Sequence, residues 1–452
     1  MEKETLNRRG FIRNSVCGAI GTVSIPAFLT GCTSASTKDE SAQLKNVEVP
    51  EILDKAPDGK PLKAGLIGCG GRGTGAAENF VAAGNGLTIT ALGDVFEDYM
   101  ALSRASLAKK GITVPDDKCF IGFDAYKKVI DSDVDIVLLC TPPVFRPLHF
   151  DYVIEKGKHC FMEKPCAVDP TGARRILATS KIADTKGLSI ISGTIRRSQK
   201  DRIETYRRVA GGAIGEIISA HVIRHGGALW FKRREPKWTD MEYMLRNWVN
   251  FCWTSGDHLV EQFIHEIDQM SWFMGDRTPV RAAATGGRQR RVTGDMYDFF
   301  SIEYSYDKGV HAHCTSRQIA GCDNETSVLV YGTKGYTNCV DSIFNYDGSV
   351  IWKYPYPKKE DADQSMAVPD PFVSEHVRLV TAIRTNKPVN DAEKHVHSVL
   401  MTIMGRMSAY TGKFVKWEDV ISSTMKLGPD TFEFGPVPGI PEEIPLAGRA
   451  VV

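Results

Sequence analysis

The sequence predicts an α/β fold with two domains, and three observations carry this prediction. A short apolar run ends in the pattern Gly68-x-Gly70-x-x-Gly73. A second apolar run ends in an acid, Asp94, about twenty residues after the last of these glycines. Between residues 217 and 330, several stretches alternate apolar and polar side chains, which is typical of antiparallel strands with one exposed face. We therefore expect a parallel sheet first and an open, mostly antiparallel sheet second.

The glycine pattern indicates a dinucleotide phosphate site. Its first glycine permits a tight turn, its second lets the backbone approach a pyrophosphate, and its third lets the following helix pack on the strand. A glycine-rich turn with no ligand is the alternative, but the flanking strands and the downstream acid favour binding. Residues 61–190 are thus predicted to form a Rossmann domain. Its expected pyrophosphate ligands are Gly68, Gly70, Gly71, Arg72 and Gly73.

Asp94 indicates which dinucleotide is bound. A carboxylate at the end of the second strand accepts hydrogen bonds from a ribose diol and repels a 2′-phosphate. The next two residues, Val95 and Phe96, offer no arginine that could neutralise a phosphate. NAD is therefore favoured over NADP. The alternative is that Asp94 only caps the next helix.

The first sixty residues indicate export. Arg8 and Arg9 precede a moderately apolar, glycine-containing stretch, the pattern of a twin-arginine signal, which exports folded proteins. That stretch is too short for a membrane-spanning helix, and it ends in Leu29-Thr30-Gly31-Cys32, which resembles a lipobox. We expect residues 1–32 to be the signal, residues 33–60 a flexible tether, and the mature protein to be periplasmic and held to the membrane only by a lipid on Cys32.

Composition excludes several classes of partner. The chain has 452 residues and 42% hydrophobic content, enough for two or three domains with large cores. Its formal net charge of +1 gives no sign of a nucleic-acid partner. None of its cysteines forms a Cys-x-x-Cys pair, so structural zinc is not expected. We expect a small-molecule substrate, no metal, and a homo-oligomer.

A further set of motifs ends the first domain. An unbroken apolar run over residues 134–140 is typical of a buried parallel strand. Ligands bind at the carboxyl ends of such strands, so Thr141 and Pro142, which follow it, should line the nicotinamide side. Beyond them come three short motifs, His149, Gly157-Lys158-His159 and Glu163-Lys164-Pro165.

These motifs, in this order, resemble those of the Gfo/Idh/MocA family of oxidoreductases. The resemblance covers residues 62 to about 420. It implies a Rossmann domain followed by an α/β domain with an open sheet, a cofactor site that includes His149 and Glu163, and a Lys164 that contacts both cofactor and reacting hydroxyl. A lysine placed there lowers the cost of forming an alkoxide. Taken alone, Lys164 could be a solvated surface charge.

The second domain, predicted over residues 191–425, contains a helix expected at 258–274. At about 100° per residue, His258, Glu261, His265 and Asp268 fall on one face of it, opposite an apolar face. The family resemblance places an Asp-x-x-x-His-x-x-Asp pattern here. This chain keeps the carboxylate but has Glu261 where Asp is usual, which leaves the duty of that carboxylate open.

His265 is the expected general base, because an imidazole pKa of about 6.5 suits proton abstraction at neutral pH. Glu261 is expected to orient the imidazole or to bind a neighbouring hydroxyl. Two alternatives are a salt-bridged face and a metal site formed by His258, Glu261 and His265. Other residues that could contribute to a sugar site are Arg196, Arg197, His225, Arg246, Asn247, Trp248 and Trp253.

The sequence therefore predicts an NAD-dependent oxidoreductase that acts on a sugar or glycoside hydroxyl, such as the 3-hydroxyl of glucosides, with tightly bound NAD. Two alternatives are an NAD-dependent glycosidase or lyase with internal redox cycling and an inactive sugar-binding module. Residues 372–384 and 395–410 should form helices that return to the first domain. The Pro- and Gly-rich tail, residues 426–452, is expected to lie over the surface or a neighbouring subunit.

Overall fold

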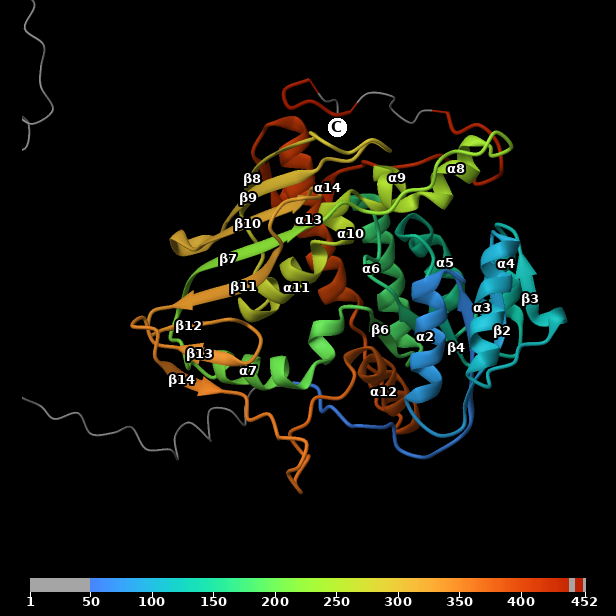
Figure 1. Cartoon of the computed structure of the whole chain (residues 1–452), viewed down its shortest axis with the longest axis horizontal. Helices are drawn as coiled ribbons and strands as arrows, with labels where there is room; N and C mark the ends of the chain where they lie inside the picture. The colour runs from blue at the N-terminus through green and yellow to red at the C-terminus, as the bar shows by residue number, and fades with distance from the viewer. Residues whose placement is uncertain (1–48, 439–443, 450–452) are drawn as a thin grey trace, which may run out of the picture. The chain divides into compact units, whose positions relative to one another are not determined.

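The computed structural model describes residues 49–438 and 444–449. The expected twin-arginine signal, the lipobox with Cys32 and most of the tether lie outside the described residues. Two sheets organise the described part of the chain, one in each predicted domain (Figure 1). No helix in this part is both long and apolar enough to cross a membrane.

The first sheet is parallel, with the strand order β3-β2-β1-β4-β5-β6. The order reverses between β1 and β4, which is the switch point where dinucleotides bind in such sheets. This confirms the predicted Rossmann arrangement. The strands are β1 (Leu62–Ile67), β2 (Leu87–Asp94), β3 (Cys119–Ile121), β4 (Ile136–Leu139), β5 (His159–Met162) and β6 (Ile190–Ser192). The helices of this domain are α2 (Gly71–Ala82), α3 (Glu97–Lys109), α4 (Ala125–Asp131), α5 (Arg146–Glu155) and α6 (Pro170–Thr185).

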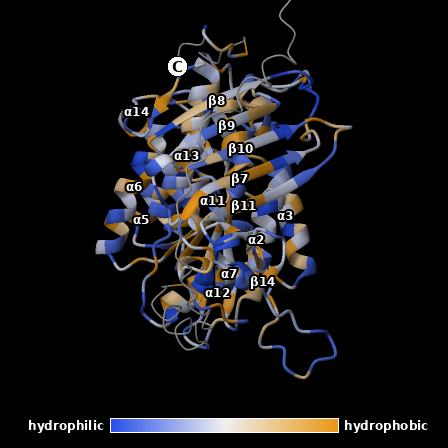
Figure 2. Ribbon diagram, turned by 90° about the vertical axis from the view of Figure 1, so that its left-hand side faces the viewer, coloured by the Kyte–Doolittle hydropathy of each residue, from blue (hydrophilic) through white to orange (hydrophobic). Residues whose placement is uncertain are grey.

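The second sheet has nine strands in the order β14-β13-β12-β11-β7-β10-β9-β8-β15. Only β7 and β10 pair in parallel, so the mostly antiparallel sheet is confirmed. Apolar and polar residues alternate along the strands β7 to β11, as Figure 2 shows. The strands are β7 (Ile217–Gly226), β8 (Arg281–Gly287), β9 (Phe299–Ser305), β10 (His311–Gln318), β11 (Glu325–Gly332), β12 (Tyr336–Thr337), β13 (Ser342–Phe344), β14 (Val350–Lys353) and β15 (Val415–Lys416).

Helices cover one face of this sheet and join it to the first domain. Helices α11 (Ile264–Phe273) and α13 (Ala392–Thr411) pack on the sheet, and α13 also contacts α6. Helix α12 (Pro371–Arg384) lies beside α2 and β6 (Figure 1), so both late helices do return to the first domain. The remaining helices are α7 (Lys200–Ala210), α8 (Asp240–Arg246), α9 (Cys252–Ser255), α10 (His258–Glu261) and α14 (Trp417–Ser422).

The core contains histidines held in their neutral form. His376 is fully buried against Phe80 and Phe161, with ring centroids 6.0 and 4.3 Å away, and neither ring nitrogen has a hydrogen-bond partner among the described residues. Burial lowers its pKa to about 3. The buried His395 behaves alike, with a pKa of about 3. Such rings act as apolar aromatic groups at neutral pH, and protonating them opposes folding.

We predict that His376→Phe makes the protein less sensitive to acid. Because the folded pKa lies below the unfolded value of about 6.5, the unfolded chain binds more protons between the two values, and stability is lost as pH falls through that window. Removing one such histidine should flatten the dependence of unfolding free energy on pH by up to about 1.4 kcal/mol per pH unit. Urea unfolding across this window measures the slope. His313→Gln, on the exposed face of the sheet, is the control, and an unchanged slope in His376→Phe contradicts the prediction.

Candidate active site

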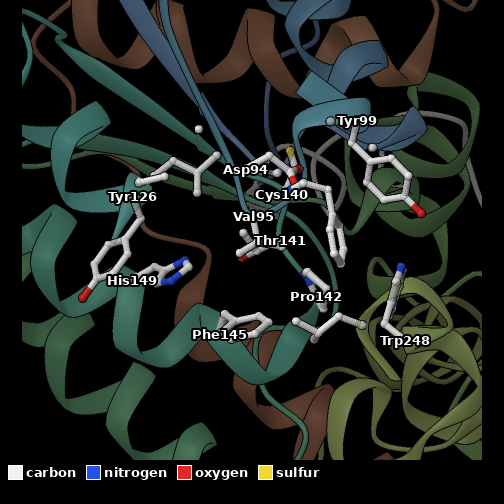
Figure 3. A pocket seen from close by; sticks show the side chains of 18 of the residues that line it. Asp94, Val95, Tyr99, Tyr126, Cys140, Thr141, Pro142, Phe145, His149 and Trp248 are labelled. Atoms are coloured by element: carbon white, nitrogen blue, oxygen red, sulfur yellow. The ribbon is translucent and has the colours of Figure 1, made fainter. Parts of the chain in front are cut away.

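A cavity of about 450 Å³ lies at the carboxyl ends of β1, β2 and β4. Figure 3 shows Asp94 and Thr141 in its centre, with Tyr126 and His149 to one side and Trp248 to the other. The predicted cofactor residues that line it are Gly68, Gly70, Gly71, Arg72, Gly73, Asp94, Thr141, Pro142 and His149. The structure therefore gathers most of the predicted cofactor set in one place, and the two exceptions are Glu163 and Lys164.

Steric limits explain the glycine pattern. Gly68 has a φ of +95°, and a Cβ there would lie 2.7 Å from the backbone of Cys140. A Cβ at Gly73 would lie 1.8 Å from the carbonyl oxygen of Gly68. Gly70 and Gly71 differ, because a Cβ at either would meet no protein atom within 4 Å. The protein's own packing thus leaves open the space that a pyrophosphate needs beside the N-terminus of α2.

Asp94 supports the glycine turn as well as lining the cavity. One carboxylate oxygen accepts a hydrogen bond from Cys69 N at 2.6 Å, and the other accepts one from Phe96 N at 2.9 Å. Burial raises the pKa of this carboxyl above its usual value. No side chain caps the first turn of α3, which follows Phe96, so the structure does not support the capping alternative. The ribose-binding role of Asp94 stays a prediction.

The cavity offers a free hydroxyl at its centre and an aromatic wall to one side (Figure 3). Thr141 Oγ1 is buried and has no hydrogen-bond partner among the described residues, so it can pair with a polar group of a bound cofactor. His149 stacks between Tyr126 and Phe145, with ring centroids 4.0 and 5.8 Å away. Burial, and secondarily the charge of Arg146, lowers its pKa to about 3. His149 thus forms part of a neutral wall.

Glu163 and Lys164 extend from the end of β5 in two directions. Glu163 accepts a hydrogen bond from Arg72 Nε at 2.6 Å, which ties this motif to the glycine turn. Lys164 crosses to the second domain, where its Nζ donates to Glu261 O at 2.6 Å and to Glu261 Oε1 at 2.9 Å. The Lys164 side chain is only 15% exposed. The alternative of a solvated surface charge is therefore wrong for Lys164.

The helix predicted over 258–274 is interrupted, and this corrects the single-face expectation. Helix α10 ends at Glu261 and α11 begins at Ile264. Gln262 N and Phe263 N both donate to His258 O, and the second of these bonds is one residue longer than an α-helical bond. The inserted residue rotates the following turn relative to the preceding one. The four titratable side chains consequently do not share one face.

His258 and Asp268 are structural residues. The ring nitrogens of His258 lie 3.1 Å from Tyr297 O and 3.0 Å from Ser316 Oγ, inside the core. Asp268 accepts hydrogen bonds from Arg197 Nε at 3.0 Å and from Ser398 Oγ at 2.7 Å. The part of the chain that the structure describes contains no cluster of three metal-ligating side chains. The geometry therefore separates His258 from Glu261 and His265, because its ring is fully engaged elsewhere.

His265 keeps an unengaged imidazole near Lys164. Within the described residues no hydrogen bond joins its ring to another group, and only its backbone carbonyl accepts one, from Arg196 Nη1 at 3.2 Å. Burial lowers its pKa well below the usual value, and the positive charges of Lys164 and Arg196 add to this shift. The ring is therefore neutral at neutral pH, the state that a general base requires.

The remaining predicted residues hold the site in place. Arg196 donates a hydrogen bond to Gln269 Oε1 at 2.7 Å and forms a salt bridge with the buried Glu266. Glu266 forms a second salt bridge with Arg224, at 3.0 Å. His225 contacts Thr315 Oγ1 at 3.3 Å on the sheet. Arg246 pairs with Asp98 at 2.9 Å, Asn247 accepts from Lys232 N at 2.6 Å, and Trp248 lines the cavity.

Sequence reasoning missed a chain of polar side chains that begins at Glu261. Gln262 Nε2 donates to Glu261 Oε2, and Gln262 Oε1 accepts from Gln318 Nε2 at 3.1 Å. Gln318 Oε1 in turn accepts from Arg291 Nη2 at 2.9 Å. It also missed Trp230, which lines the cavity from the second domain. No local signal could have found the links through Gln318, because its partners Gln262 and Arg291 are distant from it in sequence.

Comparison with known proteins identifies the family. Residues 62–190 match the model of an oxidoreductase family with an NAD-binding Rossmann fold, and residues 204–338 match the GFO/IDH/MocA C-terminal domain. Together they span more than half of the chain. The protein therefore belongs to the GFO/IDH/MocA family of oxidoreductases, with NAD as the cofactor of its Rossmann domain.

Individual relatives are distant. An inositol 2-dehydrogenase of Acidothermus cellulolyticus is 24% identical over 53% of this chain and 61% of its own length. A glycosyl hydrolase family 109 protein of Shewanella pealeana is 23% identical over 55% of this chain and 51% of its own. The chain thus spans about half to three fifths of the length of these curated relatives.

Solved structures share the fold. The scyllo-inositol dehydrogenase of Lactobacillus casei with bound NAD(H) and scyllo-inositol superposes with a TM-score of 0.59 at 18% identity, covering 79% of this chain and 100% of that one. The aldose-aldose oxidoreductase of Caulobacter crescentus gives a TM-score of 0.59 at 19% identity, with the same coverage.

We predict that Asp94→Ala lowers the preference for NAD over NADP and weakens the binding of both. The carboxylate that excludes a 2′-phosphate is lost, and so are the two acceptors that hold the glycine turn. Asp94→Asn keeps side-chain acceptor capacity without the charge, so it should relax the preference with a smaller loss of affinity. Competition binding of the two dinucleotides measures both effects. An unchanged preference in both variants would exclude Asp94 as the selecting group.

Proposed function

We propose that this protein oxidises a hydroxyl of a sugar, glycoside or polyol and passes the hydride to NAD bound in the cavity. The observation that carries the proposal is that Lys164 and His265 come close together from two domains, while Glu163, the neighbour of Lys164, is hydrogen-bonded to Arg72 of the cavity wall. Both polyol and sugar oxidoreductases occur among the similar proteins. The 3-hydroxyl of glucosides is the first position that we would test.

Lys164 is proposed to stabilise the oxyanion that develops as the hydroxyl loses its proton. Its ammonium is held between two domains by Glu261 O and Glu261 Oε1, so little reorganisation is needed when charge develops. The third ammonium proton remains available to a substrate oxygen. Glu261 thereby orients Lys164, which is a different duty from orienting His265.

His265 is proposed to accept the hydroxyl proton. Its burial keeps the imidazole neutral to a lower pH than an ordinary histidine. Bound NAD supplies the hydride acceptor. The neighbouring charges of Lys164 and Arg196 disfavour the protonated imidazole, so the base regains its neutral form readily once the substrate has reacted.

A second candidate is an NAD-dependent glycosidase or lyase in which the hydride returns to the same sugar. Similarity to glycosyl hydrolase family 109 proteins favours it. The two candidates share Lys164 and His265. They differ in products, because the first forms an oxidised sugar and leaves the bound NAD reduced until a separate acceptor takes the hydride, while the second releases an aglycone with no net change in cofactor. An inactive sugar-binding module would require neither side chain.

We predict that Lys164→Met and His265→Gln each lower turnover by roughly a hundredfold or more, the scale expected for loss of a proton-transfer group. NAD binding should survive in His265→Gln, because that residue does not line the cavity. Steady-state rates and NAD titration measure the two effects. Wild-type turnover should rise with pH through the pKa of His265 and reach half its maximum below about pH 6.5. His313→Gln, on the exposed face of the sheet, is the control, and near-normal turnover in His265→Gln would remove that histidine from the mechanism.

We also propose that the protein leaves the cytoplasm folded, with NAD already bound, and is attached to the membrane by a lipid on Cys32. The paired arginines and the lipobox-like sequence support this. Cys32→Ser should therefore move the protein from the membrane fraction to the soluble fraction with unchanged turnover. Fractionation with an activity assay measures this, and a Cys32→Ser protein that remains with the membranes would contradict the lipid anchor.

A further inference from the structure

The C-terminal segment 427–437, called the strap here, lies against the outer wall of the NAD cavity. Three aromatic residues of the first domain, Phe96, Phe123 and Phe145, line that cavity. Strap residue Phe434 packs on Phe96 and Phe123, with ring centroids 6.0 and 5.1 Å away. Strap residue Phe432 packs on Phe145 at 4.7 Å. Each of these three rings thus packs against a strap ring.

The strap is fixed at both ends. Leu427 N donates to Asp169 Oδ2 at 2.8 Å, and Asp169 also caps α6 of the first domain. At the other end, Met241 N of α8 in the second domain donates to Gly435 O at 3.0 Å. The two strap phenylalanines lie between these anchors. The strap therefore bridges the two domains over the side of the cavity formed by β2 and β3.

The second domain reinforces the same wall. Arg246 of α8 lies over the Phe96 ring at 4.0 Å and pairs with Asp98 at 2.9 Å. Lys232 donates to the hydroxyl of Tyr99, another cavity residue, at 2.6 Å. Phe96 and Phe145 are consequently only 5% and 6% exposed although they belong to a cavity wall. Opening this side of the cavity would expose them.

We propose that the strap keeps NAD from exchanging with solvent, with Phe432 and Phe434 as positioning residues that act through Phe145, Phe96 and Phe123. The proposal rests on the proposed function and deepens it. An enzyme that keeps its cofactor must reoxidise it in place, so a second carbonyl substrate, or the oxidised sugar itself, has to take the hydride back. The strap thus points to an enzyme in which NAD is reduced and reoxidised in the same active site without leaving it.

In this proposal the cavity opens to release NAD only when the contacts between the strap and the cavity wall break. The adenosine side of the cavity cannot widen unless Phe96 and Phe123 move outward, and Phe434 occupies the space into which they would move. Releasing the cofactor therefore requires the apolar contacts of the strap to break at the same time. Phe434 itself is 46% exposed, but the aromatic contacts on its inner side are still costly to lose, so they slow dissociation more than association.

The test measures NAD exchange in the full-length holoenzyme. Wild type, Phe432→Ala, Phe434→Ala and the double variant are incubated with excess isotopically labelled NAD and desalted, and the bound isotope ratio is followed by mass spectrometry. We expect NAD exchange in the double variant to be at least about tenfold faster than in wild type. This ratio corresponds to a barrier to NAD release that is lower by ~1.4 kcal/mol. Phe434→Leu, which keeps most of the apolar volume, should recover most of the slow exchange.

Two controls separate retention from general stability. Leu446→Ala removes an exposed apolar side chain of the tail, and Phe414→Ala removes an exposed aromatic ring that precedes the tail. Neither should alter the exchange rate. If the double variant melts at a lower temperature but exchanges NAD at the wild-type rate, the strap only supports the fold and the proposal is overturned. If the double variant does not fold, the NAD exchange rates of Phe434→Ala and Phe434→Leu test the proposal instead. Exchange at the wild-type rate in Phe434→Ala then overturns it. A wild-type protein that contains no NAD when purified and binds none when it is added contradicts the proposed function itself.

Discussion

The contact of Lys164 with Glu261 is the interaction on which the site depends. Lys164 follows β5 of the Rossmann domain and Glu261 ends α10 of the second domain, so the pair sets where the two domains meet. Both side chains are largely buried. A buried ion pair contributes little net stability compared with apolar packing, but leaving one partner uncompensated is costly. The pair therefore constrains geometry more than it stabilises the fold.

The break between α10 and α11 follows from this constraint. Glu261 must face the first domain to receive Lys164, while Asp268 must face Arg197 and α13. A continuous helix brings both carboxylates to the same face, and the extra residue in the turn at Gln262 separates them. It also leaves the imidazole of His265 without a hydrogen-bond partner among the described residues, beside a fixed ammonium. Because of this irregular turn, Glu261 and Asp268 face different partners, although the sequence pattern places them on one helix face.

The residues that could be placed from the sequence are those whose positions depend on local backbone geometry. Gly68, Gly73 and Asp94 could be placed from sequence because local sterics and strand ends decide their roles. Thr141 could be placed because it follows a recognisable strand. Lys164, which the family resemblance places in the cofactor site, does not line the cavity and contacts Glu261 of the second domain instead. His258 and Asp268 could not, because their roles depend on Ser316, Tyr297 and Ser398, which are distant in the chain. In the sequence, apolar and polar residues keep helical spacing through the interruption between α10 and α11. The spacing therefore gives no sign that the helix is interrupted. The tail was expected over the surface, and its contact with the cavity wall depends on ring packing that no motif encodes.

The central claim is that a substrate hydride moves to NAD bound in this cavity while Lys164 and His265 handle the proton. A single-turnover experiment tests it most directly. The NAD-loaded protein is mixed with sugars, glycosides and polyols deuterated at the reacting carbon, and the cofactor is then recovered and analysed. The account predicts deuterium on the nicotinamide ring, transferred more slowly than hydrogen, with transfer abolished in Lys164→Met. Products that form while the bound NAD stays unlabelled with every substrate would contradict it.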